Sequence, residues 1–381
     1  MAIIGAGPAG LSAAWDLALE GYQVTVFEAL PVAGGMLAVA IPEYRLPNDI
    51  LSKEVQEIEN LGVDIRLNTP VSDVESLLKD GYKAVFIATG AHKGEKMGIP
   101  GEDLGGVYDA IEFLREVNLG KEVQVGKRVA IVGGGNSATD SARVALRKGA
   151  EKVHIFYRRE RKDMPAIPEE IEAAEEEGIN FHFLTAPTRI LGNEEGVNGL
   201  ECIRMELREF DRSGRRTPNP VAGSEYVVDT DMVIEAIGQR PDTSFIKHNE
   251  IKMGRGGRVV ADRRTLATGR KGIFAGGDAV TGPQTVIEAI AAGQRAASSI
   301  KRYLQGKELS PLVERDGYEP IAISSVPPSD EETREKARIR ASEIAMSQRK
   351  ASFKEITLTY SLEEATEEAS RCLRCDLEVG E

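Results

Sequence analysis

Near its start the chain reads Ile3-Ile4-Gly5-Ala6-Gly7-Pro8-Ala9-Gly10, a glycine-rich stretch between an apolar run and an Ala-rich run. Glycines at this spacing allow a tight strand-to-helix turn, a close approach of the backbone to a pyrophosphate, and close packing of helix on strand. The pyrophosphate then lies at the positive end of the helix. The stretch therefore predicts a dinucleotide-binding strand, turn and helix.

An acidic residue follows at the distance that such a site requires. Residues 24–27 predict a second strand, and Glu28 ends it. A carboxylate at this place accepts hydrogen bonds from a ribose diol, so the first site favours an unphosphorylated adenosine ribose. For a single match, an ordinary glycine-rich turn followed by a solvated Glu is the alternative.

A second glycine-rich stretch, Gly133-Gly134-Gly135-Asn136-Ser137, follows the apolar residues 129–132. The next predicted strand, residues 153–157, ends not at an acid but at the basic residues Arg158, Arg159, Arg161 and Lys162. Guanidinium groups bind a ribose 2′-phosphate, which a carboxylate would repel, so this site favours NADP(H) over NAD(H). Glu160 lies within the basic run, which leaves a solvated mixed-charge loop as the alternative. Two such sites in one chain indicate electron transfer between two nucleotides.

Composition narrows the class of protein. The chain has 381 residues and a net charge of −13, which argues against nucleic acid or an anionic membrane as a partner. No apolar run approaches the ~20 residues of a membrane-spanning helix. Three Cys do not make a disulfide scaffold, so we expect a cytoplasmic protein of two or three domains.

The chain begins abruptly, because Met1 and Ala2 directly precede the first apolar strand. We therefore expect a fragment of a longer polypeptide or a trimmed subunit, with a naturally short N-terminus as the alternative.

The order of predicted elements gives an α/β fold with two Rossmann-like domains, the second inserted into a discontinuous first. Residues 83–90 and 231–238 are both apolar strands that break at a glycine. After the second of these, residues 272–278 predict a strand that ends at an acid, and a helix follows over residues 284–304. The predicted division is therefore 1–115 with 241–309 for the first domain and 116–240 for the second. Within the second, residues 186–228 alternate as antiparallel β-structure.

The last 72 residues, 310–381, differ in character and form a predicted helical C-terminal extension. We expect a charged helix over residues 331–348 and another that starts at an N-cap, Ser361. The extension ends in a Cys-x-x-Cys pair, Cys372 and Cys375.

At this level of detail the sequence resembles the small (β) subunit of glutamate synthase and its relatives, which are FAD- and NADPH-binding flavoproteins with two dinucleotide-binding domains. Subunits of electron-bifurcating transhydrogenases belong to the same group. The resemblance covers residues 1 to about 305 and is carried by Gly5-Ala6-Gly7-Pro8-Ala9-Gly10-Leu11, Gly34-Gly35-Met36-Leu37, Ile41-Pro42-Glu43-Tyr44-Arg45-Leu46-Pro47, Ala88-Thr89-Gly90, residues 133–140, Tyr157-Arg158-Arg159 and Gly276-Gly277-Asp278.

The resemblance implies FAD in the first site and NADP(H) in the second. Glu28 would hold the adenosine ribose of FAD and Asp278 its ribityl chain, and the helix that starts near Thr285 would face the flavin pyrimidine. The implied FAD residues are Gly5, Gly7, Pro8, Ala9, Gly10, Glu28, Gly35, Met36, Arg45, Ala88, Thr89, Gly90, Gly277, Asp278, Gln284, Thr285 and Val286. The implied NADP(H) residues are Gly133, Gly135, Asn136, Ser137, Arg158, Arg159 and Gly238.

The chain also departs from the family that it resembles. Members usually carry an N-terminal cysteine-rich domain with two [4Fe–4S] clusters, and this sequence lacks it. Cys372 and Cys375 form half of a cluster motif, and a cluster needs four ligands. Either a partner or a missing segment completes a metal site there, or the two are reduced thiols.

Together these features predict an oxidoreductase that passes hydride between NADPH and FAD and relays electrons to an iron–sulfur partner. A flavoprotein module that relays electrons within a larger complex, without turnover of its own, is the alternative. A dithiol reductase is disfavoured because Cys202 is the sole cysteine within the nucleotide domains. The four histidines show no metal-binding spacing and are predicted to be structural.

Overall fold

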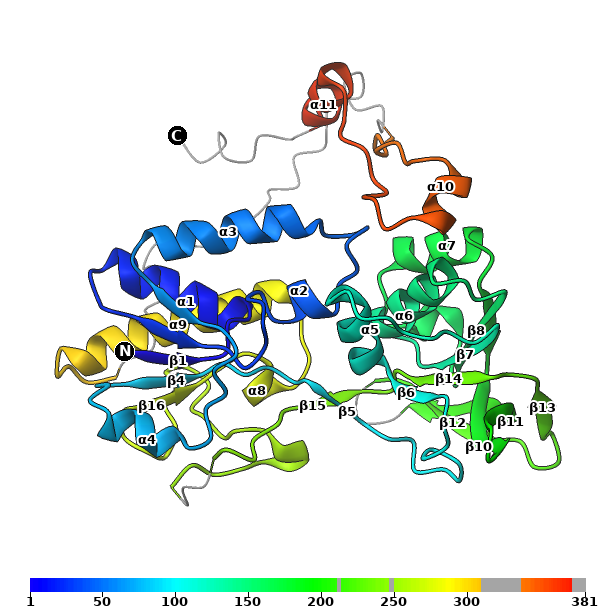
Figure 1. Cartoon of the computed structure of the whole chain (residues 1–381), viewed down its shortest axis with the longest axis horizontal. Coiled ribbons are helices and arrows are strands. Elements are labelled where there is room, and N and C mark those ends of the chain that lie inside the picture. Colours follow the sequence, from blue (N-terminus) through cyan, green and yellow to red (C-terminus); the bar gives the residue numbers. More distant parts are fainter. Residues whose placement is uncertain (211–213, 247–249, 310–336, 372–381) are drawn as a thin grey trace.

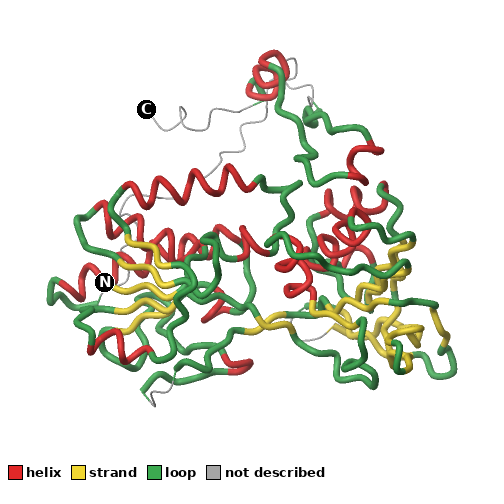
Figure 2. Tube along the Cα trace, in the orientation of Figure 1, coloured by secondary structure: helices red, strands yellow, loops and turns green. Residues whose placement is uncertain are grey.

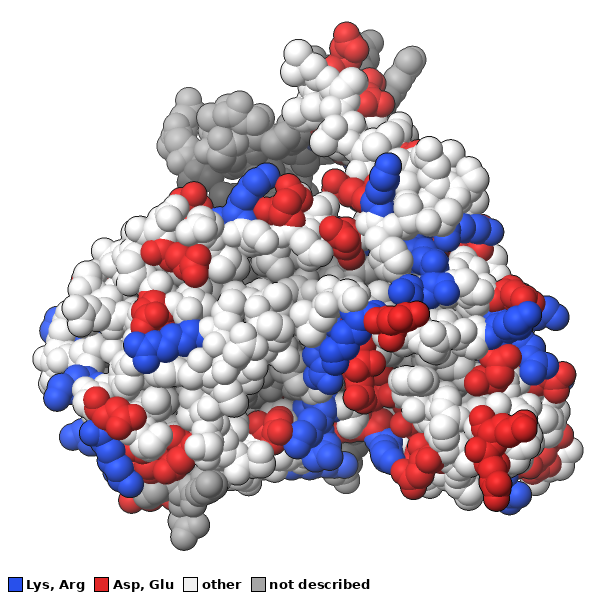
Figure 3. Space-filling model, in the orientation of Figure 1, with Lys and Arg blue, Asp and Glu red and all other residues white. Residues whose placement is uncertain are grey.

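The computed structural model describes residues 1–210, 214–246, 250–309 and 337–371 (Figure 1). Two α/β units lie side by side, one formed by the blue and yellow parts of the chain and the other by the green part. In the first unit helices lie on both sides of the strands, whereas in the second unit the helices gather on one side of the strands, as Figure 2 shows. On the face shown in Figure 3, basic and acidic side chains are interspersed and neither sign forms an extended patch among the described residues.

The first unit contains a five-stranded parallel sheet. Its order is β16 (Ile273–Ala275), β4 (Val85–Ile87), β1 (Ala2–Ile4), β2 (Thr25–Phe27) and β3 (Asp64–Arg66). These strands are short and mostly buried, because helices cover a parallel sheet on both faces. Strand β16 pairs with β4 although 185 residues separate their ends in sequence, so the first unit is discontinuous, as predicted.

Two long helices, α1 (Pro8–Leu19) and α9 (Val286–Leu304), pack against each other beside this sheet. The contact depends on Gly293, where a Cβ would lie only 2.3 Å from the Ala9 carbonyl oxygen. Sequence predicted both helices, and α3 (Asn48–Asn60) lies in the same unit. The shorter helices α2 (Met36–Val39), α4 (Val74–Lys79) and α8 (Asp278–Thr281) complete the unit.

The second unit repeats this plan. Its parallel sheet has the order β6 (Val107–Asp109), β14 (Met232–Glu235), β7 (Arg128–Val132), β8 (Lys152–Tyr157) and β9 (Asn180–Phe183). Helices α5 (Ala110–Asn118), α6 (Asn136–Arg147) and α7 (Pro168–Glu176) belong to it. The predicted antiparallel insert is present as β10 (Thr185–Asn193), β11 (Gly196–Phe210), β12 (Arg216–Pro220) and β13 (Tyr226–Val228).

A two-stranded antiparallel ribbon, β5 (Lys93–Gly94) with β15 (Gln239–Arg240), connects the two units. Strand β5 follows residues 83–90 and strand β15 follows residues 231–238, the two apolar segments that break at a glycine. The chain therefore crosses between the units twice at one place.

The structure differs from the predicted division at one boundary. Residues 107–115, assigned to the first domain, form β6 and part of α5, and they belong to the sheet and core of the second unit. The three-residue strand β6 is too short to produce a periodic signal, so sequence gave no indication that the second sheet starts there.

The C-terminal extension also differs from expectation. In the described part of the predicted 331–348 helix, residues 337–345 are not helical, and α10 (Met346–Ala351) begins only near its end. The Ile344 amide instead donates to the Ile356 carbonyl, which pairs two extended segments. Helix α11 (Leu362–Ala369) starts at Ser361 with a capping box, as predicted. Cys372 and Cys375 lie outside the described residues.

Among the described residues, no helix is both long enough and apolar enough to span a membrane.

Candidate functional site

A continuous cavity of about 1500 Å³ runs between the two units and reaches both glycine-rich turns. All the predicted site residues of the described chain line this cavity except Gly10. Residues more than 200 positions apart in sequence therefore meet along one surface.

The first glycine-rich turn connects β1 to α1. Gly5 has φ +104°, and a Cβ there would lie 2.5 Å from the Ala88 carbonyl oxygen. Gly10 faces inward rather than into the cavity, since its Cβ would lie 2.0 Å from the Gly5 oxygen. At Gly7 the nearest atom to an added Cβ is 3.8 Å away. The absence of a side chain at Gly5 and Gly10 thus allows the turn to pack against neighbouring backbone. At Gly7 it leaves space in the cavity beside the turn.

Glu28 is held in place by backbone amides at the end of β2. Its Oε2 accepts from the Ala6 amide and its Oε1 from the Leu30 amide, each at 2.8 Å, and the residue is 7% exposed. Each oxygen keeps a lone pair for a further donor. A ribose diol is such a donor, so the carboxylate fits the predicted role.

Two observations test whether a flavin nucleotide fits the first unit. The Thr89 Oγ1 atom lines the cavity, is buried, and has no hydrogen-bond partner in the described chain. Gly35, at φ +56°, brings its backbone so close to Gly7 that a Cβ would lie 2.7 Å from the Gly7 Cα. Both features fit a flavin nucleotide. A bound ligand could pair with the buried hydroxyl, and the close backbone next to a helix N-terminus leaves room for a pyrophosphate and an isoalloxazine ring.

Asp278 lies at the start of α8, where the cavity meets the first turn of α9. Its Oδ1 accepts from the Gln284 amide at 3.2 Å. Burial, with the charge of Glu288 in addition, raises the pKa of Asp278 to about 6. Helix α9 begins with a capping box between Thr285 and Glu288, so its positive end faces the cavity beside Asp278.

The second glycine-rich turn connects β7 to α6. At Gly133 an added Cβ would lie 2.2 Å from the Ala236 carbonyl oxygen, and at Gly134 it would meet the Tyr157 ring at 2.5 Å. Asn136 and Ser137 line the cavity but already have protein partners. The Asn136 Oδ1 accepts from the Ile167 amide at 2.9 Å, and Ser137 accepts from Gln239 at 3.2 Å.

The residues of the basic cluster after β8 differ in their exposure to solvent. Arg158 is exposed, lines the cavity and makes no hydrogen bond or ion pair within the described chain. Arg159 is 7% exposed, and its Nε donates to the Arg216 carbonyl at 3.0 Å. Glu160 was the reason for the alternative interpretation of this segment as a solvated mixed-charge loop. It pairs with Arg216 at 2.5 Å and with Lys162 at 2.8 Å.

Sequence analysis missed one basic residue of this region. Arg215, from the antiparallel insert, lines the same cavity as Arg158 and Arg159. The only local signal was the Arg215-Arg216 pair after a turn. Pairing of the insert against β11 brings it to the site from far along the chain.

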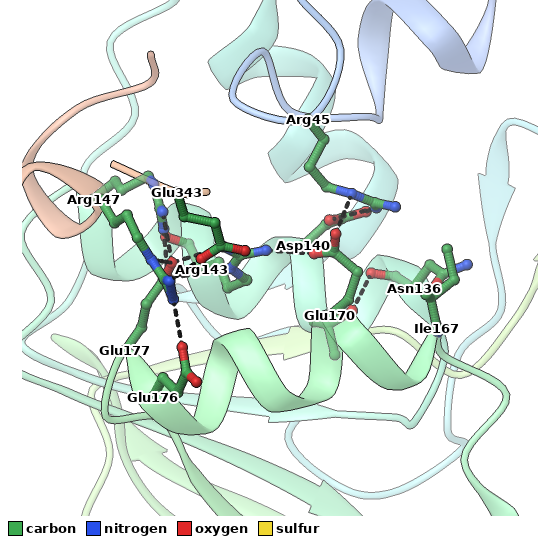
Figure 4. Close-up of polar contacts among 12 residues, drawn as sticks. Arg45, Asn136, Asp140, Arg143, Arg147, Ile167, Glu170, Glu176, Glu177 and Glu343 are labelled. Carbon is green, nitrogen blue, oxygen red and sulfur yellow. Dashed lines mark hydrogen bonds and ion pairs between the residues drawn. The ribbon is translucent and has the colours of Figure 1, made fainter. Parts of the chain in front are cut away.

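Arg45 bridges the two units (Figure 4). From the loop before α3, its guanidinium donates to both Asp140 oxygens at 3.0 Å and pairs with Glu170 at 3.0 Å. Asp140 lies on α6 and Glu170 on α7, both in the second unit. Burial raises the pKa of Asp140 to about 6, although Arg45 opposes the shift. Arg45 lines the cavity, but an interdomain ion pair already holds its charged end.

A buried ion network continues from this contact. Glu177 is 1% exposed, and its two oxygens accept from Arg143 and Arg147 at 2.7–3.2 Å. Both guanidinium groups also lie over the ring of Tyr44, 4.8 and 4.1 Å from its centroid. Arg349 of the extension joins the network through Glu176 at 2.9 Å.

The remaining candidates for chemistry do not form a site. Cys202 is buried on β11, and burial raises the pKa of its thiol to about 12, so it stays a neutral thiol. The sequence did not anticipate that His154 and His182 would meet, with Nδ1 and Nε2 2.9 Å apart on neighbouring strands. The described residues contain no group of three or more metal-ligating side chains.

Comparison with known proteins agrees with this geometry. The family described as pyridine nucleotide-disulphide oxidoreductase matches residues 1–293. The chain is 48% identical to the NADP(+)-dependent formate dehydrogenase subunit beta of Moorella thermoacetica, over 98% of this chain and 54% of the relative. It is 44% identical to the NADPH-Fe(3+) oxidoreductase subunit beta of Geobacter sulfurreducens, over 98% and 61%. It is 37% identical to the glutamate synthase [NADPH] small chain of Azospirillum brasilense, over 81% and 67%.

Solved structures share the fold. FprA of Mycobacterium tuberculosis in complex with NADPH is similar with a TM-score of 0.69 and 21% identity, over 80% of this chain and 84% of that one. Thioredoxin reductase of T. acidophilum gives 0.61 and 25%, over 80% and 97%. The predicted two-domain dinucleotide-binding fold is confirmed. The chain spans only 54–61% of the length of the first two relatives.

Proposed function

Since this chain belongs to the pyridine nucleotide-disulphide oxidoreductase family, we propose that it takes hydride from NADPH onto FAD and delivers the electrons to an iron–sulfur partner. The single cavity that reaches both glycine-rich turns carries this proposal, because it gives two dinucleotides a common space in which their reactive rings can meet. The bound cofactors supply the redox chemistry, and the protein supplies position and electrostatics.

In the first unit, Glu28 would hold the adenosine ribose, and Gly5, Gly7 and Gly35 would leave room for the pyrophosphate. Thr89 would give its unpaired hydroxyl to the bound flavin nucleotide. The positive end of α9 would stabilise negative charge on the reduced ring. These assignments rest on the distances and burial described above.

In the second unit, Arg158 is the main proposed contact for the 2′-phosphate. It is exposed at the cavity and makes no hydrogen bond or ion pair within the described chain, so binding would not first break an ion pair. Arg159 and Arg215 line the same cavity and add positive charge. Charge-assisted hydrogen bonds of this kind contribute about 1.5–3 kcal/mol each.

The names of the relatives support an electron acceptor outside this chain. Two are beta subunits that act with NADP(H), and matches over 98% of this chain necessarily include most of the C-terminal extension. We therefore infer that the extension, with Cys372 and Cys375, belongs to the part that faces a partner. Completion of a [4Fe–4S] cluster by that partner, and a cytoplasmic location, are parts of the same proposal.

Anaerobic titration of the FAD-loaded chain with NADPH, and separately with NADH, tests the proposal. Flavin absorbance should bleach at a much lower concentration of NADPH than of NADH. Arg158→Ala should raise the NADPH concentration needed by about tenfold or more, corresponding to a loss of ~1.4 kcal/mol or more. The matched control is Arg161→Ala, because Arg161 is exposed but paired with Glu175 at 3.0 Å and is not a cavity residue.

The same titration separates the two functional candidates. Equal bleaching by NADH and NADPH would refute the phosphate assignment. Absence of bleaching by either nucleotide, with FAD bound, would refute a self-sufficient reductase. That result would favour the relay module, for which NADPH-driven dye reduction should also be absent.

A further inference from the structure

The C-terminal extension touches both units at the place where they meet. In Figure 1 helix α10 lies beside α7, close to the loop that precedes α3. We call residues 346–356, which comprise α10 and the segment after it, the strap. The strap is packed into the molecule, because Arg349 is 4% exposed and Ile356 is 6% exposed.

The strap binds the second unit at the ends of two helices. Arg349 of α10 pairs with Glu176, the last residue of α7, at 2.9 Å, and its guanidinium also pairs with Glu343. The Nε atom of Arg147, the last residue of α6, donates to the Ser352 carbonyl at 3.2 Å. Hydrogen bonds with an ionised donor are stronger than neutral ones, and salt screens buried pairs less than exposed pairs. The strap is therefore fixed to the second unit through both α6 and α7.

The strap also binds Tyr44 of the first unit. The Ile356 amide donates to the Tyr44 carbonyl at 3.2 Å, and the rings of Phe353 and Tyr44 have their centroids 6.3 Å apart. The side chains of Tyr44 and Ile356 belong to one buried apolar cluster, whose other buried members lie in the second unit. Two guanidinium groups of α6 lie over the same Tyr44 ring. Tyr44 is thus enclosed between the strap and α6, although its chain neighbours lead back into the first unit.

Tyr44 lies next to residues that line the cavity. Its loop, residues 41–47, joins α2 to α3, and Met36 at the start of α2 is a predicted flavin residue on the cavity wall. Arg45, the residue after Tyr44, makes the ion pairs with α6 and α7 that connect the two units. A displacement of Tyr44 therefore displaces Arg45 and the backbone beside the proposed flavin site.

From these contacts we propose that Arg349 and Ile356 are positioning residues for hydride transfer, which act by holding Tyr44 and with it the junction between the two cofactor sites. The inference rests on the proposed function. Neither residue lines the cavity, so an effect on the reaction must pass through the junction. The strap exchanges no atom or electron in the step, in which NADPH gives its hydride, with two electrons, to FAD and leaves as NADP⁺. It affects the geometry of that transfer, and a misplacement of ~1 Å can slow a reaction by about 100-fold.

Stopped-flow reduction of the FAD-loaded chain by NADPH tests the proposal. Arg349→Ala and Ile356→Ala should each lower the limiting rate of flavin reduction by about tenfold or more, since the junction would no longer hold the two rings in place. The NADPH concentration that gives half this rate should change by less than about twofold, because the second glycine-rich turn and Arg158 are untouched. Ile356→Val, which keeps most of the buried side chain, should keep the rate within about threefold of wild type.

Hydrogen–deuterium exchange of the loop checks the route by which the strap acts. The amides of Arg45 and Leu46 donate to the Pro42 carbonyl at 2.9 and 3.1 Å, so their exchange reports the order of the loop. They should exchange faster in both Ala variants, while peptides of α1 exchange as in wild type, which distinguishes release of the loop from unfolding. Arg340→Ala is the matched control, because the Arg340 side chain belongs to the same extension but is 83% exposed and lies 3.8 Å from Glu172. It should change neither the rate nor the exchange.

Loop exchange as slow as in wild type in both Ala variants would mean that the strap does not hold the loop, and the inference would be wrong. A loop that exchanges faster, with an unchanged rate of flavin reduction, would overturn the inference as well. If NADPH does not reduce the flavin of the wild-type chain, the proposed function itself fails. A wild type that NADPH reduces, beside Ala variants with the same rate, removes the inference alone and leaves the proposed function intact.

Discussion

The buried carboxylate of Glu177 should stabilise the second unit more than any exposed ion pair does, and Glu177→Gln tests this. Its two oxygens accept four hydrogen bonds from Arg143 and Arg147 at 2.7–3.2 Å. The side chains of Glu177 and Arg147 are both fully buried. Removing one partner of a buried ion pair costs about 3–5 kcal/mol. We expect about 3 kcal/mol, because Arg143 keeps Glu170 and Arg147 keeps the Ser352 carbonyl.

Urea unfolding followed by far-UV circular dichroism measures this loss. Trp15, the only tryptophan, lies on α1 of the first unit, so its fluorescence reports that unit separately. The dichroism transition should shift to lower urea by more than the fluorescence transition does. Glu175→Gln is the control, because its pair with Arg161 is 40–44% exposed and should contribute less than ~1 kcal/mol. A loss for Glu177→Gln no larger than for this control would refute the reasoning.

The pH dependence of the same variant has a definite sign. Burial raises the pKa of Glu177, but hydrogen bonds from Arg147 and Arg143 outweigh burial, and the net pKa is lowered. A carboxylate with a lowered folded-state pKa stabilises the fold above its unfolded pKa and loses that contribution as the pH falls through the folded value. The difference between wild type and Glu177→Gln should therefore be full at pH 7 and shrink below about pH 4.

Four further substitutions address the cavity and the turn beside it. Gly10→Ala should abolish folding of the first unit, because the added Cβ would lie 2.0 Å from the Gly5 carbonyl oxygen. Gly7→Ala should keep the fold, because the atom nearest to its added Cβ is 3.8 Å away. It should lower the affinity for FAD by about tenfold or more, measured by flavin fluorescence. Asp278→Asn should raise the urea midpoint of the FAD-free chain above about pH 6 and leave it unchanged below about pH 4, since a raised folded-state pKa penalises the ionised form; an equal effect at both pH values would contradict this. Arg45→Ala should slow flavin reduction by NADPH in stopped flow without loss of bound FAD, and reduction at the wild-type rate would contradict its interdomain role.

The parts of the site that sequence predicted are those fixed by local geometry. Gly5, Gly133 and Glu28 belong to motifs in which a strand, a turn and a helix follow one another directly, so their spacing alone determines their place. Helix α9 was also predicted, from its place directly after the strand and acid of residues 272–278.

The contacts that sequence did not predict join residues distant along the chain. Arg45 meets Asp140 across 95 positions, and Arg349 meets Glu176 across 173, with no local signal for either contact. The predicted 331–348 helix is wrong over residues 337–345 because charge pattern suggested a helix, whereas the pairing of Ile344 with Ile356 favours an extended segment. Tertiary pairing overrides weak helical propensity in such segments.

Helix α6 links these observations, because one element serves both the cofactor turn and the interdomain contact. Its N-terminus forms the second glycine-rich turn, and Asp140, Arg143 and Arg147 follow on the same helix. Tyr44 lies under both arginines, and its carbonyl accepts from the Ile356 amide of the extension. Arg45, α6 and Glu177 therefore share partners, and their effects on stability should not add. The double variant Arg45→Ala with Glu177→Gln should differ from the sum of the single variants by about 0.5–3 kcal/mol in urea unfolding, and simple additivity would mean that the two contacts are independent.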